Sequence, residues 1–339
     1  MTTPNAVVFG VSGTRLTADE RVFLRDADPL GFILFARNCA DAAEIRRLTA
    51  ELRDVVGRDD APILIDQEGG QVMRLRPPDW PFAPAARDIA CLFDHTPELG
   101  IAAAENLGRM FGAMLIDLGI DVDCAPVLDL GLPETTDAIG SRAYAADPEI
   151  VATLGGAMAR GLIREGCLPV IKHLPGHGRG AVDSHKELPR VNADLATLRG
   201  QDFAAFRALR QLPLGMSAHV VYTAIDPDRP GTVSSTLIET LIRGEIGFDG
   251  FLFTDDICMA ALDGSPAGRA EAALSAGCDA VLHCSGVLSE MIEVSGAVGQ
   301  LSRSADSRWT RARATRQKPE GADIGELAET LAAQFENGI

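Results

Sequence analysis

The chain has 339 residues, of which 46% are hydrophobic, 34 are glycine and 19 are proline. This composition excludes a disordered, collagen-like or coiled-coil protein, and it suffices for one large domain or two small ones. The 31 basic and 48 acidic residues give a formal charge of −17, which argues against nucleic acid or an anionic membrane as a partner.

The cysteines and the N-terminus indicate the compartment. The seven cysteines are an odd number, form no C-x-x-C pair and lie mostly inside apolar segments, as free buried thiols do. The N-terminal segment MTTPNAVVFGVSG lacks the pattern of a signal peptide, and no run of about 18 apolar residues appears. We therefore expect a soluble cytoplasmic protein.

Eight short apolar segments recur along the chain, each followed by a polar turn and an amphipathic stretch. They are Val7–Val11, Gly31–Ala36, Pro62–Ile65, Ile120–Leu128, Leu168–Ile171, Leu212–Ala218, Gly250–Phe253 and Cys278–Leu282. Their nearly continuous apolar character is typical of parallel strands that are buried on both faces. Alternation of eight such strands with helices predicts a (β/α)₈ TIM-type barrel, with a doubly wound open sheet as the alternative.

Helices are predicted between these strands by spacing and by capping residues. One helix is expected within Ala40–Val56, a second over Leu195–Leu209 after Asp194, and a third over Ser235–Ile246 before Gly247. Asp and Ser before a helix and Gly after it are the residues preferred at the two ends.

The C-terminal part resembles a helical extension more than a separate domain. The segment Arg308–Lys318 is basic, Pro319–Asp323 interrupts the helical pattern, and Ile324–Phe335 predicts a final helix. We expect residues 1–339 to form a single catalytic barrel domain, with a helical extension over about residues 302–339 packed on it. A nucleic-acid-binding arm is the less favoured reading because the whole chain is acidic.

Polar residues follow the strands at the third to seventh apolar segments. In a parallel barrel the active site lies at the C-terminal ends of the strands, so these residues are expected to converge on one pocket. They include Asp66, Glu68 and Arg74; Asp129; Lys172, His173, His177, Asp183 and His185; His219; and Asp255 and Asp256.

Asp255 follows the apolar segment that ends at Phe253. A carboxylate there is held rigidly and is partly removed from water, which suits a nucleophile that attacks an anomeric carbon. The adjacent Asp256 is expected to point elsewhere and to brace the loop. The alternative is that Asp255 is only a capping or ion-paired residue.

The triplet Asp183-Ser184-His185 predicts an acid/base pair. A carboxylate bonded to one ring nitrogen fixes the histidine tautomer and leaves the other nitrogen free to exchange a proton. Gly176, Gly178 and Gly180 precede the triplet and predict a loop that can move. An ordinary polar surface loop is the alternative.

Five further residues are candidates for binding a sugar. Asp66 and Arg74 form an acceptor and donor pair, and a carboxylate can bind two adjacent hydroxyl groups. Lys172, His173 and Arg142 are expected to supply donors.

In combination, these motifs resemble glycoside hydrolase family 3. The motifs are K-H-L-P-G-H-G followed by D-S-H, I-D-Q-E-G-G-x-V-x-R upstream and F-T-D-D-I-x-M downstream, and they extend over about residues 5–290 in family order. The sequence looks most similar to the bacterial single-domain β-N-acetylglucosaminidases of cell-wall recycling. Leu174 stands where that family more often has an aromatic residue, and the chain has no room for the second sandwich domain of many β-glucosidases.

The resemblance implies a role for each matching residue. Asp255 would form a covalent glycosyl-enzyme, and His185 would donate and accept the proton while Asp183 orients it. Asp66, Arg74, Arg142, Lys172 and His173 would bind N-acetylglucosamine (GlcNAc), and neither a metal nor an organic cofactor is expected. The substrate would be a small sugar, GlcNAc linked to anhydro-N-acetylmuramic acid with or without peptide, and we expect a monomer.

Several alternatives remain open on the residues. A barrel metallohydrolase could use His173, His177, Asp183, His185, His219 and Asp255 as metal ligands. A β-glucosidase or β-xylosidase of the same family, a GlcNAc phosphorylase and a non-catalytic sugar sensor are the others.

Overall fold

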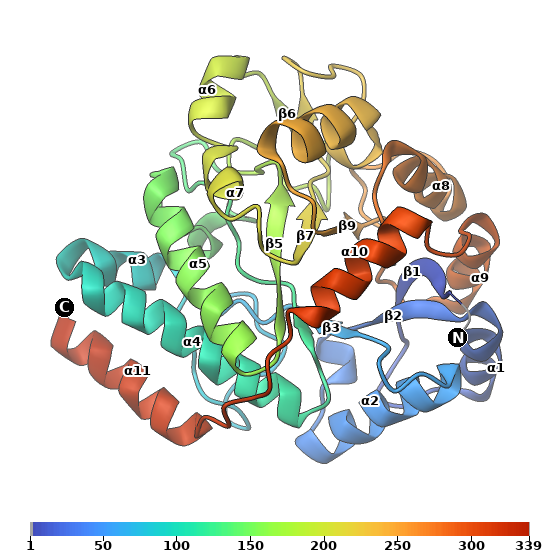
Figure 1. The fold of residues 1–339 in the computed structure, drawn as a ribbon, viewed down its shortest axis with the longest axis horizontal. Coiled ribbons are helices and arrows are strands. Elements are labelled where there is room, and N and C mark those ends of the chain that lie inside the picture. The colour runs from blue at the N-terminus through green and yellow to red at the C-terminus, as the bar shows by residue number, and fades with distance from the viewer. Residues whose placement is uncertain (1–2, 339) are drawn as a thin grey trace.

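The eight apolar segments form eight parallel strands that close into a barrel (Figure 1). The structure is a computed structural model that describes residues 3–338. The barrel strands are β1 (Asn5–Gly10), β2 (Pro29–Leu34), β3 (Ile63–Ile65), β4 (Val122–Asp123), β5 (Leu168–Leu174), β7 (Leu214–Ser217), β9 (Phe251–Asp256) and β10 (Ala280–His283). Their order around the barrel is β1-β10-β9-β7-β5-β4-β3-β2, so the (β/α)₈ prediction is confirmed and the open sheet is wrong.

The helices surround the barrel (Figure 1). They are α1 (Ala18–Ala27), α2 (Ala42–Val56), α3 (Ala86–His95), α4 (Pro97–Asp117), α5 (Pro148–Arg164), α6 (Leu195–Gly200), α7 (Ala204–Ala208), η4 (Thr236–Ile246), α8 (Pro266–Ala276), α9 (Leu288–Ala297), α10 (Arg303–Ala314) and α11 (Ile324–Gly338). Short helical turns are η1 (Ala36–Asn38), η2 (Gly140–Arg142) and η3 (Gly231–Val233), and β6 (Arg190–Val191) pairs with β8 (Val221–Tyr222) outside the barrel. Within residues 3–338, no helix has the length and apolar character needed to cross a lipid bilayer.

Alternate strand residues build two separate apolar layers. On β1, Val8 belongs to the cluster that fills the barrel, whereas Val7 and Phe9 belong to the cluster between the sheet and the helices. Both sets are fully buried. Strands buried on both faces need continuous apolar sequence, which is why each segment reads as an unbroken run.

Two predicted strands have different ends in the structure. The segment Ile120–Leu128 contributes only β4, because Pro126 lies inside it and has no N–H to donate to a strand ladder. By contrast, β5 continues to Leu174 and β9 to Asp256. Lys172, His173 and Asp255 therefore lie within the ends of strands rather than in the loops that follow.

The predicted helix Leu195–Leu209 is wrong as a single element. Asp194 caps α6 by accepting a hydrogen bond from Thr197 N at 2.9 Å, but the helix ends at Gly200 and a new one begins at Ala204. Asp202 lies in this break, buried, and accepts a hydrogen bond from Arg179 at 2.8 Å. The break therefore turns a carboxylate inward to hold the loop after β5.

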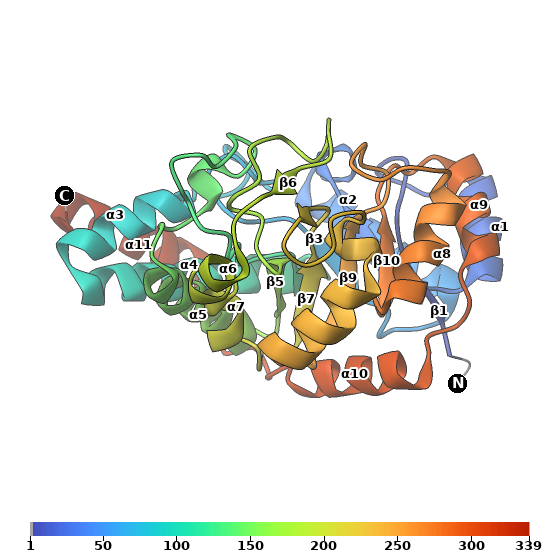
Figure 2. The same ribbon diagram turned by 90° about the horizontal axis from the view of Figure 1, so that it is seen from above.

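The C-terminal helices pack on different parts of the barrel. The α10 helix crosses the end of the barrel opposite the long loops (Figure 2). There the Trp309 ring lies 5.4 Å from that of Phe251. Helix α11 packs along α4 and extends three residues beyond the predicted Phe335 (Figure 1). Arg308 forms ion pairs with Asp249 and Asp279, so this basic residue serves intramolecular contacts.

Candidate active site

One cavity of about 360 Å³ opens at the C-terminal ends of the barrel strands. All eight site residues expected from the sequence line it: Asp66, Arg74, Arg142, Lys172, His173, Asp183, His185 and Asp255. Glu68, His177 and Asp256 line it as well. Residues that are up to 189 positions apart (Asp66 to Asp255) therefore meet at one rim, as the barrel topology requires.

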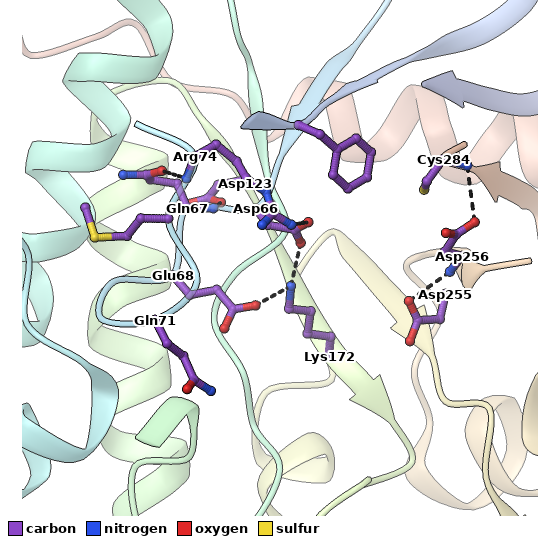
Figure 3. Close-up of polar contacts among 12 residues, drawn as sticks. Asp66, Gln67, Glu68, Gln71, Arg74, Asp123, Lys172, Asp255, Asp256 and Cys284 are labelled. Atoms are coloured by element: carbon purple, nitrogen blue, oxygen red, sulfur yellow. Dashed lines mark hydrogen bonds and ion pairs between the residues drawn. The ribbon is translucent and has the colours of Figure 1, made fainter. Parts of the chain in front are cut away.

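Asp255 lies at the end of β9, across the cavity from Asp66 and Glu68 (Figure 3). Its Oδ1 accepts a hydrogen bond from Asp256 N at 2.8 Å. Burial works to raise the pKa of Asp255, but the nearby His173 and His219 rings and the Asp256 N–H outweigh it and lower the pKa. The carboxylate is thus ionised at neutral pH, as a nucleophile must be.

Asp256 points away from Asp255 and braces the loop, as the sequence predicted. Its Oδ1 accepts a hydrogen bond from Cys258 N at 2.9 Å. It also accepts one from Cys284 N at 3.2 Å (Figure 3). The carboxylate thereby ties the segment after β9 to the end of β10. This contact fixes the backbone that carries Asp255.

Lys172 is the centre of a buried ionic cluster on the other side of the cavity (Figure 3). Its Nζ lies 2.8 Å from Asp66 Oδ1 and 2.6 Å from Glu68 Oε1, and Arg74 reaches Asp66 Oδ2 at 2.7 Å. Burial works to raise the pKa of Asp66, but Lys172 and Arg74 outweigh it and hold the pKa well below the usual value. Conversely, the carboxylates raise the pKa of Lys172 against the effect of burial.

Arg142 completes this cluster through Glu68. Its Nε and Nη2 donate to Glu68 Oε2 and Oε1 at 2.7 and 2.8 Å, a two-pronged ion pair. Lys172 and Arg142, which the sequence predicted as donors to a sugar, are therefore each held by carboxylates. The cluster has three cations (Lys172, Arg74, Arg142) and two anions (Asp66, Glu68), a net charge of +1 that faces Asp255.

Gln67 shapes the loop that carries Arg74. Its buried side chain accepts from Arg74 N at 2.9 Å and donates to Leu75 O at 3.0 Å, while its own N–H donates to Asp123 at 3.0 Å. The loop after β3 is thus anchored from within. Arg74 can then hold a fixed position beside Asp66.

His173 is oriented by Asp129, a residue to which the sequence gave no role. Asp129 is fully buried, its Oδ2 lies 2.6 Å from His173 Nδ1, and its Oδ1 accepts from His177 N at 2.6 Å. Burial works to raise the pKa of Asp129, but His173 and His177 outweigh it and lower the pKa to about 2. The contact occupies His173 Nδ1 and leaves Nε2 for the cavity. Asp129 could be recognised in sequence only as a polar residue after the fourth strand.

The buried His177 ring is expected to make stability depend on pH. Burial lowers its pKa to about 4 from 6.5, so the unfolded chain binds the proton more readily between these values. Stability is therefore expected to fall as the pH drops from 6.5 to 4, by up to about 3 kcal/mol. Denaturant unfolding at pH 7 and pH 4.5 measures this.

The matched variant His177→Gln isolates the contribution of this ring, because His219 and His283 also have pKa values lowered by burial and add to the slope. The variant should lose less stability between the two pH values than the unsubstituted chain. Equal losses in both proteins would contradict the assignment.

Asp183 and His185 form the predicted pair on the loop after β5. The Nδ1 of His185 lies 2.9 Å from Asp183 Oδ1, which also accepts from His185 N at 3.0 Å. The pKa of Asp183 is lowered: burial acts to raise it, and the hydrogen bonds from His185 outweigh that effect. The His185 side chain is 68% exposed, so its second nitrogen is free at the mouth of the cavity that also contains Asp255.

The glycines of this loop allow close packing more than motion. A Cβ on Gly178 would lie 2.4 Å from Leu130 O, and one on Gly180 would lie 2.8 Å from the His177 ring. The Tyr222 hydroxyl also donates to Gly176 O at 2.6 Å. Residues 176–180 are therefore packed firmly, and the exposed part of the loop begins after them.

The metallohydrolase alternative is not supported by the positions of its six residues. Within residues 3–338, the only group of three or more His, Cys, Asp or Glu side chains close enough to share a metal is Cys258, His283 and Glu290. None of these belongs to the set that the alternative requires. The histidines of the cavity are instead bonded to Asp129, Asp183 and Ser184.

Comparison with known proteins places the chain in a family. The sequence model for the N-terminal domain of glycosyl hydrolase family 3 matches residues 6–313. A β-hexosaminidase of Alkalilimnicola ehrlichii is 40% identical over 282 residues, which cover 82% of this chain and 80% of that protein. A β-hexosaminidase of Pseudomonas aeruginosa is 38% identical over 311 residues, covering 91% and 90%.

Solved structures extend the similarity to the whole fold. NagZ from Neisseria gonorrhoeae in complex with N-trifluoroacetyl-D-glucosamine superposes with a TM-score of 0.88 at 29% identity, covering 99% of each chain. The chain therefore belongs to glycosyl hydrolase family 3 and is a glycoside hydrolase of its β-hexosaminidase branch.

Proposed function

We propose that the chain is a retaining exo-β-N-acetylglucosaminidase that removes terminal GlcNAc from peptidoglycan fragments through a covalent intermediate on Asp255. The observation that carries this proposal is the shared cavity, which has an ionised carboxylate at the end of β9 and the Asp183–His185 pair at its mouth. A carboxylate and a separate acid/base are the two groups that retaining hydrolysis needs.

The first step would form a bond between Asp255 and the anomeric carbon. The leaving oxygen takes a proton from His185 as its bond to that carbon breaks. In the second step His185 accepts a proton from water, and the water oxygen displaces the Asp255 ester. Two displacements at one carbon give net retention of configuration.

Asp183 would position this proton transfer. Its carboxylate bonds Nδ1 of His185, so Nε2 is the nitrogen left to exchange the proton. Because the proposed acid/base is a histidine, it adds no negative charge of its own beside Asp255. Inorganic phosphate can then approach in place of water, so GlcNAc phosphorolysis is a second candidate activity.

The ionic cluster would bind the sugar ring. Asp66 keeps Lys172 and Arg74 in fixed positions, and fixed charged donors and acceptors bind hydroxyl groups at little cost in conformational entropy. Glu68 would hold Arg142 in the same way. The structural similarity to a protein in complex with N-trifluoroacetyl-D-glucosamine supports an acetamido sugar.

The proposal includes a peptidoglycan fragment as the substrate and the cytoplasm as the location. The family branch that the motifs resemble acts on cell-wall fragments, and all seven cysteines are free thiols, which suits a reducing compartment. We propose further that the enzyme acts as a monomer on this small sugar, without a cofactor and without nucleic acid or membrane as partners.

Hydrolysis of an aryl β-N-acetylglucosaminide, with the products followed by NMR, tests the proposal. The β-anomer of GlcNAc should appear first. An aryl β-glucoside should react at least about 100-fold more slowly, because a site that hydrogen-bonds a substrate group rejects an analogue that lacks it. Release of the α-anomer first would contradict retention. Addition of phosphate should give GlcNAc 1-phosphate if phosphorolysis occurs, and binding of GlcNAc without product would identify a sensor.

A further inference from the structure

A buried histidine outside the sugar cavity forms no regular hydrogen bond within residues 3–338. His283, at the end of β10, is fully buried, and neither of its ring nitrogens makes a hydrogen bond within the described part of the chain. It faces the layer between the sheet and the helices, where its ring meets that of Phe9 at 5.9 Å. An imidazole buried without a hydrogen bond costs free energy, so its position needs an explanation.

Two further metal-ligand side chains point toward this ring. Cys258 follows β9 and Glu290 lies in the first turn of α9, and the donor atoms of the three residues all lie within 4.8 Å of one another. The Nε2 of His283 is 3.3 Å from Glu290 Oε2. Three donors from three different elements thus surround one point.

We propose that Cys258, His283 and Glu290 bind a divalent metal ion, with Zn²⁺ as the cation that best matches a thiolate, an imidazole and a carboxylate. Zinc takes these three ligand types at about 2.0–2.3 Å, and water can supply the fourth position of a tetrahedron. Donor atoms of such a tetrahedron lie roughly 3.3–3.8 Å apart. The His283–Glu290 distance of 3.3 Å already fits, and donors within 4.8 Å of one another reach this geometry with shifts of about an ångström or less.

The protonation states and the surroundings suit this role. Burial lowers the pKa of His283, so the ring is neutral and has a lone pair to offer. Burial and Asp256 raise the pKa of the Cys258 thiol to about 12, so the metal must displace its proton to solvent as the metal–sulfur bond forms. Ser285 Oγ donates to Glu290 Oε2 at 2.7 Å and orients the carboxylate.

The proposed site is separate from the sugar cavity but shares a contact with it. None of its three residues lines the cavity. Asp256, which accepts from Cys258 N, also donates its own N–H to Asp255. The Glu290 side chain is 38% exposed, which gives an ion a route from solvent.

Metal titration of the full-length chain, after reduction and removal of metal with a chelator, tests the proposal. Calorimetry should show one Zn²⁺ per chain, and Co²⁺ should give the thiolate-to-cobalt charge-transfer band. Cys258→Ser should abolish that band and weaken Zn²⁺ binding about 100-fold or more, since loss of even an outer-shell partner costs 10–100-fold. Glu290→Gln, at a half-exposed position that tolerates substitution, should weaken binding as well.

Cys91→Ser is the matched control, because Cys91 is exposed and outside the trio. It should retain both the Zn²⁺ affinity and the cobalt band. Absence of Zn²⁺ binding by the unsubstituted chain would overturn the proposal, as would unchanged binding in both Cys258→Ser and Glu290→Gln. The proposal would also be overturned if His185→Ala lost Zn²⁺ binding while Cys258→Ser and Glu290→Gln retained it. That result would show that the metal binds in the sugar cavity.

Discussion

Replacing Asp255 with asparagine is expected to lower kcat on an aryl β-N-acetylglucosaminide by about four orders of magnitude, equivalent to about 5.5 kcal/mol of transition-state stabilisation. The carboxylate is ionised in the cavity, and the charge-neutral amide cannot form the glycosyl ester. Since asparagine has nearly the same size, KM should change far less than kcat. Steady-state kinetics with the purified variant measures both.

Two variants show whether the loss comes from chemistry or from folding. Asp263→Asn changes an exposed acid eight positions away and should leave kcat within about twofold. Asp256→Asn weakens the brace between the segments after β9 and β10 and should give an intermediate loss. If Asp255→Asn retained normal turnover while folded, the nucleophile would have to be another residue.

Barrel topology brings every C-terminal strand end to one rim, so the residues that meet there could be predicted from the sequence. Asp66, Lys172 and Asp255 were all found in this way, although they are far apart in sequence. Only the approximate position of each strand matters for this convergence. Errors of a few residues at the ends of β5 and β9 therefore do not change the predicted set.

The convergence of strand ends does not determine which side chains pair with one another. Glu68 was visible as an acid after the third strand, yet its two-pronged contact with Arg142 joins residues 74 positions apart. Asp129 likewise meets His173 from a different strand end. Such pairs depend on the rotamers and depths of side chains in the folded barrel, which no local pattern encodes.

Glycine spacing was misleading for a related reason. Gly178 and Gly180 read as hinges in the sequence, but in the structure each lies too close to a neighbour to carry a side chain. Glycine is used both for freedom of the backbone and for close approach, and only the neighbours distinguish the two. The exposed part of the loop, which carries the proposed proton donor, lies further along the chain, around Asp183.

His185→Ala is expected to give a loss that depends on the leaving group. Natural disaccharides have a poor leaving oxygen that needs a proton, so kcat/KM should fall by about 10²–10⁴-fold. A nitrophenyl leaving group departs without a proton, so the first step should be nearly unchanged. The glycosyl-enzyme should then accumulate because water lacks its base, and a burst of nitrophenol should appear.

Azide separates this explanation from a structural defect. As an anion, azide attacks the Asp255 ester without a base, so it should restore turnover in His185→Ala and yield a β-glycosyl azide. Lys186→Ala is the matched control on the same loop: its side chain is 82% exposed and 3.5 Å from Asp183, so the loss should stay within a few-fold. Equal losses for natural and nitrophenyl substrates, with no rescue by azide, would show that His185 does not transfer the proton.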